Sequence, residues 1–308
     1  MTTHLYFSPS STEHSTPDGH PERPARYTAV MDALDADAFS GLERFETQAA
    51  DTALFALAHP EQQIESLSSR VPEEGRVRID PDTVMSPKTW DCVHQAVGGG
   101  VTSVDAVFEK TADNTFLVAR PPGHHAEKTT AMGFCFINTA AVMARHAQKA
   151  HGAERVAIVD WDVHHGNGTQ DIFEDDPTVL YASTHQMPLY PGTGAASETG
   201  VGNIVNAPLS PGMDGDGFKE AFRERVLPAV TDFRPDLIII SAGFDAHHRD
   251  PLANILLEEE DFDWATGKLM DCADAHCGGR IVSLLEGGYD LQGLATSAAA
   301  HVSRLMRG

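Results

Sequence analysis

Two apolar segments, each followed directly by acidic residues and histidine, constrain the fold of this chain more than any other feature. The first continues into Asp160-Trp161-Asp162-Val163-His164, and the second, 237–242, continues into Gly243-Phe244-Asp245-Ala246-His247. Near-continuous runs of Ile, Leu and Val are typical of parallel strands that are covered on both faces. Ligands of open α/β sheets bind at the carboxyl ends of such strands. We therefore expect the polar residues after both segments at one edge of a sheet.

These polar residues have the composition of a metal site. Residues two apart in a strand point to the same side, so Asp160, Asp162 and His164 should converge. The alternative is a strand end whose charged groups are simply solvated. If these groups are buried with the apolar segment, however, they need partners, because removing water from an unpaired charge is costly. Asp162, His164 and Asp245 would supply three protein ligands and leave a position open, as in a catalytic zinc site.

The remaining pattern predicts the fold class. Strand-like segments at 5–8, 115–119, 156–160, 179–183, 237–242 and 281–285 alternate with helical ones at 24–34, 86–110, 138–150, 218–233, 258–277 and 294–306. Such alternation predicts an α/β protein with three α/β/α layers and a central, mainly parallel sheet. We expect one domain, residues 1–308. Gly98-Gly99-Gly100 should break or kink the helix at 86–110.

Composition limits the classes of partner. The net charge is −23, with only six lysines against 45 acidic residues. Such a surface repels nucleic acid, so DNA or RNA binding is not expected. The charge has two explanations: an acidic surface adapted to a salty cytoplasm, or steering of cationic substrates toward the site.

The expected compartment is a reducing cytoplasm. No apolar run approaches the length that spans a membrane, and the residues from Met1 lack the pattern of a signal peptide. The four cysteines have no metal-type pair spacing and are too few for a disulfide framework. We expect no membrane partner, and the oligomeric state is left open.

Three further loops contain residues suited to catalysis or to lining a binding slot. His124 and His125 follow the predicted strand at 115–119, and imidazoles suit proton transfer near neutral pH; loop histidines bonded to backbone are the alternative. Tyr289 follows two glycines and has a hydroxyl that suits oxyanion stabilisation, unless it simply packs over the turn. Phe134 and Tyr190 would wall a slot for an aliphatic chain, or else belong to the core.

Taken together, these segments resemble the zinc-dependent histone deacetylases, specifically the class II branch and the bacterial histone deacetylase-like amidohydrolases. The resemblance spans about residues 17–300, in five separated motifs that occur in order. It implies an arginase/deacetylase-like α/β fold and a hydrolase that removes acetyl or other short acyl groups from the lysine ε-amine of proteins or peptides.

The resemblance implies a role for each site residue. The zinc ligands would be Asp162, His164 and Asp245, which agrees with the choice made from the residues. His125 would be the general base and His124 an electrostatic or acid group. Their supporting partners would be Asn167 for His125 and Asp160 for His124. Tyr289 matches the tyrosine that stabilises the transition state and favours an active enzyme.

The resemblance also implies potassium and substrate-binding positions. Potassium would lie beside the zinc, at Asp160, Asp162, His164, Ser183 and Thr184. A second monovalent site would use the backbone near Phe173, Asp176 and Val179. The acyl tunnel and its rim would be formed by Gly133, Phe134, Tyr190, Leu252, Asp82 and Arg26.

Substrate choice leaves alternatives. Polyamine-selective relatives carry a glutamate after the Asp-Pro that follows the third ligand, whereas here Asp250-Pro251 precedes Leu252. This favours acyl-lysine over a small acylated amine such as an acetylpolyamine. A binuclear manganese ureohydrolase would need further carboxylates around a second metal, and no motif in the sequence places them. A non-catalytic acyl-lysine reader should have lost a ligand, His125 or Tyr289, and none is lost.

Overall fold

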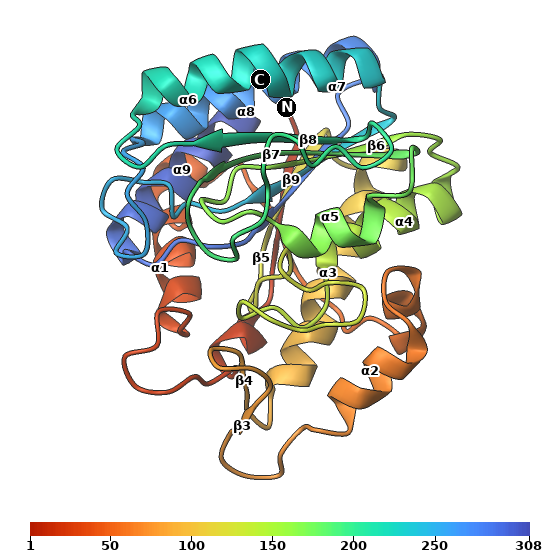
Figure 1. Ribbon diagram of the computed structural model, residues 1–308, viewed down its shortest axis with the longest axis vertical. Helices are drawn as coiled ribbons and strands as arrows, with labels where there is room; N and C mark the ends of the chain where they lie inside the picture. The colour runs from red at the N-terminus through yellow and green to blue at the C-terminus, as the bar shows by residue number, and fades with distance from the viewer.

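A single parallel sheet organises the molecule (Figure 1). The computed structural model describes residues 1–308, and eight strands follow the order β2-β1-β5-β10-β9-β6-β7-β8. Every neighbouring pair is parallel, as the sequence pattern predicts. The strands are β1 Thr3–Phe7, β2 Glu43–Glu46, β5 Asn114–Val118, β6 Val156–Asp160, β7 Val179–Gln186, β8 Ile204–Leu209, β9 Leu237–Ala242 and β10 Ile281–Leu285; a separate antiparallel pair is β3 Val77–Arg78 and β4 Val84–Met85.

The central strands are apolar on both faces because helices cover both. In β9, Ile238 and Ile240 join one buried cluster, whereas Leu237 and Ile239 join the other. This division follows from the two-residue period of a strand. It explains why the sequence shows continuous apolar runs here rather than an alternating pattern.

The two helical layers flank this sheet. Figure 1 shows α6, α7 and α8 on one side of it and α3, α4 and α5 on the other. The first cluster packs against α1 Ala25–Leu34, α6 Gly215–Ala221, α7 Leu227–Phe233, α8 Glu259–His276 and α9 Leu291–Arg307. The second packs against α2 Glu61–Ser68, α3 Thr89–Phe108, α4 Thr139–His151 and α5 Asn167–Phe173. A π-helical turn, Phe222–Val226, joins α6 to α7, and 3-10 turns occupy Pro9–Thr12, Asp37–Phe39 and Thr52–Leu57.

The three consecutive glycines do not break α3, contrary to the expectation. The helix runs without interruption from Thr89 to Phe108, because the glycines are points of close packing. A Cβ on Gly98 would collide with the carbonyl oxygen of Gln48, and one on Gly100 would press on Met143 of α4. Tertiary packing therefore requires the residues that local propensity disfavours.

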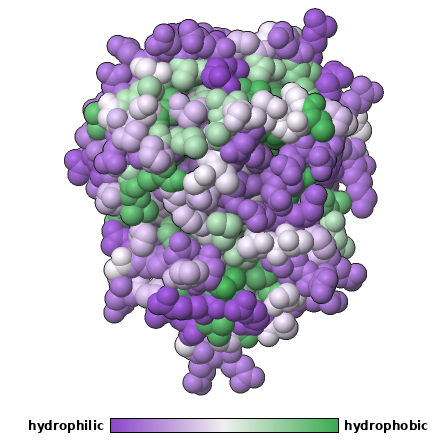
Figure 2. Space-filling view, in the orientation of Figure 1, coloured by the Kyte–Doolittle hydropathy of each residue, from purple (hydrophilic) through white to green (hydrophobic).

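The surface is mostly hydrophilic, as Figure 2 shows for one face. Six large apolar side chains are exposed: Met1, Phe45, Tyr190, Val201, Leu252 and Leu256. None of the helices is long and apolar enough to cross a membrane.

Replacement of Gly98 by alanine tests the packing explanation for α3. Alanine improves helix propensity by about 1 kcal/mol, but overpacking against fixed backbone typically costs about 1–3 kcal/mol. We expect Gly98→Ala to lower the free energy of unfolding in urea. Thr102→Ala, at an exposed position on the same helix, should change it by less than about 0.5 kcal/mol. Stabilisation by Gly98→Ala would contradict the explanation.

Candidate active site at the carboxyl edge of the sheet

The predicted site residues gather at the carboxyl ends of four adjacent strands, β5, β10, β9 and β6. His124 and His125 follow β5, and Tyr289 follows β10. Asp245 follows β9, and Asp162 and His164 follow β6. Because parallel strands all end at one edge, residues more than 160 positions apart in the chain meet there.

Asp162, His164 and Asp245 form a compact, buried group. Their ligand atoms all lie within 4.8 Å of one another. Nδ1 of His164 is 3.1 Å from both Asp162 Oδ1 and Asp245 Oδ2. Asp160 does not join them, although it was expected to converge with them. Its carboxylate turns instead toward His124 and the hydroxyl of Tyr181.

The charges of this group fit a divalent cation. Burial and the neighbouring Asp162 carboxylate raise the pKa of Asp245 to about 7. Burial alone would lower the pKa of His164, but its two carboxylate partners raise it to about 10. Neither carboxylate has a lysine or arginine partner. Two buried carboxylates and one imidazole nitrogen directed at one point are the donor set that zinc accepts.

The tandem histidines have different surroundings. Nδ1 of His124 lies 3.0 Å from Asp160 Oδ2. Burial opposes its charge, but Asp162 and Asp160 raise the pKa of His124 well above its usual value. Nδ1 of His125 instead faces the side-chain oxygen of Asn167 at 2.8 Å. Burial and the neighbouring His124 and His164 lower the pKa of His125, so the protonated form is favoured at His124 and the neutral form at His125.

Tyr289 lines the same site, with its ring 6.5 Å from that of His164, and is held through its backbone. Its N–H donates to Asp250 Oδ2 at 2.6 Å, while Asp250 Oδ1 accepts the N–H of Leu252 at 3.0 Å. Asp250 thus fixes two cavity residues at once. Arg26 lies behind the Tyr289 ring, 4.9 Å from its centroid, and donates to the carbonyls of Gly288 and Glu286.

The loop after β10 contacts both the segment of the tandem histidines and the carboxylates of the potential metal group. Glu286 is fully buried, and its Oε2 accepts the N–H groups of Gly123 and His124. Burial raises its pKa to about 7. The N–H of Gly287 donates to Asp162 Oδ2 at 2.7 Å, and a Cβ on Gly287 would collide with the carboxylates of Asp162 and Asp245. Only glycine lets the backbone approach both carboxylates so closely.

A cavity of about 240 Å³ opens onto these groups. Five of the six substrate-binding residues named from the sequence line it, and Arg26 does not. Leu189 also lines the cavity and was not expected there, because no distinctive local pattern in the sequence marks it. The lining residues are Asp82, His125, Gly133, Phe134, His164, Leu189, Tyr190, Leu252 and Tyr289.

Two of the residues named for potassium, Asp162 and His164, belong to the potential metal group, and Asp160 and Ser183 lie beside it. Asp160 and Ser183 pair in register on β6 and β7. Ser183 Oγ lies 2.9 Å from Nδ1 of His185. Five carboxyl groups are buried nearby: Asp160, Asp162, Asp245, Asp250 and Glu286. Such a concentration of buried carboxylate oxygens fits an additional monovalent cation.

The second monovalent site named from the sequence is filled by a side chain. Nδ2 of Asn203 donates to the carbonyl oxygens of Phe173, Asp176 and Val179 at 2.7, 2.9 and 2.8 Å. Its Oδ1 accepts the N–H of Val201, which sets the orientation of the amide. These residues do not fit a second cation, because the amide nitrogen already occupies the point where the three carbonyls converge.

Comparisons with known proteins place the chain in a family and agree with the fold. The family model described as the histone deacetylase domain matches residues 20–305. A probable deacetylase of Archaeoglobus fulgidus is 38% identical over 303 residues, which cover 95% of this chain and 83% of that protein. The histone deacetylase-like amidohydrolase of Pseudomonas aeruginosa is 37% identical over 278 residues, covering 88% and 73% of the two chains. The crystal structure of the HDA15 HD domain superposes with a TM-score of 0.93 at 35% identity, over 98% of this chain and 88% of that one.

Removal of the Asn203 amide should create the cation site that it fills. Asn203→Ala leaves buried carbonyls short of a donor, which costs roughly 1–3 kcal/mol. We expect a lower melting temperature in choline buffer, and a larger rise on adding potassium than the wild type shows. Asn254→Ala, which removes an exposed amide, should behave as the wild type. An equal potassium response in wild type and Asn203→Ala would contradict this assignment.

Proposed function

This chain belongs to the histone deacetylase family, and we propose that it is a zinc-dependent deacylase. Its substrate class would be proteins or peptides that carry an acetyl or other short acyl group on a lysine ε-amine. Membership of the family supports an amide-hydrolysing enzyme. The zinc, the lysine specificity and the residue roles are the parts that we propose.

One observation carries the proposal: a potential metal group, a base and a phenol border the same cavity. His164, His125 and Tyr289 all line it. The ring centroid of His164 is 5.9 Å from that of His125 and 6.5 Å from that of Tyr289. An acyl group at the base of the cavity would therefore lie within reach of all three.

Zinc would be held by Asp162, His164 and Asp245, and when bound it supplies a Lewis acid for an amide carbonyl and for water. His125, with its lowered pKa, is suited to accept a proton from the attacking water and return it to the departing amine. The hydroxyl of Tyr289 donates to the oxyanion as it develops. The products are a carboxylic acid, acetate for an acetyl group, and a free amine.

Neighbouring residues set the tautomer of His125 and the charge of His124. The side-chain oxygen of Asn167 accepts the Nδ1–H of His125 and leaves Nε2 as the basic nitrogen. Asp160 holds His124 in the same way, and the positive charge favoured there adds electrostatic stabilisation to an oxyanion. Arg26 acts through the Tyr289 ring and its loop rather than from the cavity.

The cavity walls suit an acylated lysine side chain. Phe134, Leu189, Tyr190 and Leu252 offer apolar surface to a methylene chain. Asp82 lines the same cavity and is half-buried. It is suited to accept a hydrogen bond from a substrate backbone.

A monovalent cation is part of the proposal. Potassium would lie at Asp160 and Ser183, with Asp162, His164 and Thr184, where several carboxyl groups are buried close together. It would offset the repulsion among these carboxylates without entering the cavity.

Replacement of the phenol tests the role of Tyr289. Tyr289→Phe should lower kcat about 100- to 1000-fold, the usual loss when one oxyanion donor is removed, and leave the zinc content unchanged. Tyr27→Phe, which removes a phenol outside the cavity, serves as the matched control. Normal turnover by Tyr289→Phe would exclude the oxyanion role.

Position 252 tests the choice between lysine and polyamine. Wild type should have a higher kcat/KM for an acetyl-lysine peptide than for N-acetylspermidine, because Leu252 offers no charge to a distant ammonium. Leu252→Glu should shift the ratio about fivefold toward the polyamine, as expected for one partly exposed ion pair of about 1 kcal/mol.

Leu256→Glu places the same charge at an exposed leucine outside the cavity and should leave the ratio unchanged. A wild type that prefers N-acetylspermidine would overturn the lysine assignment while leaving the deacylase assignment in place. Hydrolysis of neither substrate by the zinc-loaded protein would favour a non-catalytic acyl-lysine reader.

A further inference from the structure

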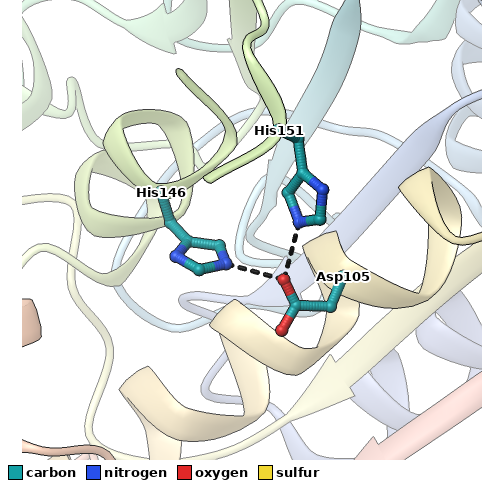
Figure 3. A group of neighbouring side chains, drawn as sticks. All are labelled: Asp105, His146 and His151. Atoms are coloured by element: carbon teal, nitrogen blue, oxygen red, sulfur yellow. Dashed lines mark hydrogen bonds and ion pairs between the residues drawn. The ribbon is translucent and has the colours of Figure 1, made fainter. Parts of the chain in front are cut away.

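A second group of potential metal ligands lies between α3 and α4 (Figure 3). Asp105 belongs to α3, and His146 and His151 belong to α4. The Nε2 atoms of both imidazoles lie 2.7 Å from the same carboxylate oxygen, Asp105 Oδ1. The three ligand atoms all lie within 4.8 Å of one another. One nitrogen from each imidazole is therefore directed at the same point.

The ring of His151 is held in place before any ligand arrives. It stacks on Phe108 with a centroid distance of 4.6 Å and an interplanar angle of 9°. His146 meets His151 edge to face, at 5.6 Å and 79°. Because these contacts fix the imidazoles, little side-chain entropy would be lost on coordination.

The group is accessible to an ion from solution. The side chains of His146, His151 and Asp105 are 14%, 17% and 36% exposed. Their burial is partial, so a hydrated cation could reach them and keep water in its remaining positions. The net charge of −23 raises the local concentration of cations.

We propose that Asp105, His146 and His151 bind a divalent transition-metal ion, such as zinc, as a clip between α3 and α4. Two imidazoles and one carboxylate form a donor set of borderline softness that suits zinc, nickel or copper rather than magnesium or calcium. The ion would displace the imidazole protons that now face the carboxylate.

The clip lies away from the active site. Asp105 is near the carboxyl end of α3, which leads into the start of β5 at Asn114. His151 ends α4, which leads into the start of β6 at Val156. The clip therefore lies toward the amino-terminal edge of the sheet, opposite the edge that carries the cavity. Its role would be to stabilise two helices, one of which is weakened by three glycines.

Zinc stoichiometry, measured by equilibrium dialysis, tests the proposal. The wild type should bind two zinc ions per chain. His146→Gln/His151→Gln should bind one and keep its deacylase activity, and Asp105→Asn should give the same result. His248→Gln removes an imidazole from another surface group and should leave the count at two. Wild-type binding that the clip variants do not reduce would overturn the proposal.

A second measurement separates the clip from the proposed active-site metal. In Asp245→Asn, zinc at a hundredfold excess over its dissociation constant should raise the melting temperature by about 4–6 °C. Adding His146→Gln/His151→Gln should abolish that rise. If Asp245→Asn does not lower the zinc count but the clip variants do, the clip stands and the proposed active-site ligands are wrong. A rise that survives in the triple variant would contradict the clip.

Discussion

The repulsion between two buried carboxylates, Asp162 and Asp245, is the constraint on which the rest of the site depends. Each accepts a backbone N–H, that of Gly287 for Asp162 and that of Val163 for Asp245, and both are fully buried. His164, with a raised pKa, lies between them, and Nε2 of His124 is 3.8 Å from Asp162 Oδ1. The loops that follow β6, β9 and β10 all meet at these two carboxylates. The cation that we propose at this point would therefore also help to fix the shape of the cavity.

The central fold could be predicted because its signal is local. Six strands are buried on both faces, and their apolar runs mark them directly. The two missed sheet strands lack that signal: β2, Glu43–Glu46, is an exposed edge with two glutamates, and β8, Ile204–Leu209, contains Asn206 and Pro208. The continuity of α3 could not be predicted, because it depends on how closely Gln48 and Met143 approach the glycines.

The chemically active side chains of the cavity, His125, His164 and Tyr289, could be predicted in a similar way, since each follows the end of a strand in a recognisable motif. The residues that hold them could not. Asp250, Glu286 and Asn203 act on backbone groups of distant segments, and no periodicity records which backbone group a buried carboxylate or amide will reach. Arg26 was named for the cavity, yet its donors are used by the loop behind Tyr289. Contacts of this kind become visible only in three dimensions.

The most direct test of the central claim is acetate release from an acetyl-lysine peptide while zinc is added stepwise to the chelator-stripped protein. We predict no turnover in the stripped protein, a rise with added zinc, and no rise in Asp245→Asn. Full turnover by the stripped protein, or equal recovery in Asp245→Asn, would contradict a zinc-dependent reaction at Asp162, His164 and Asp245.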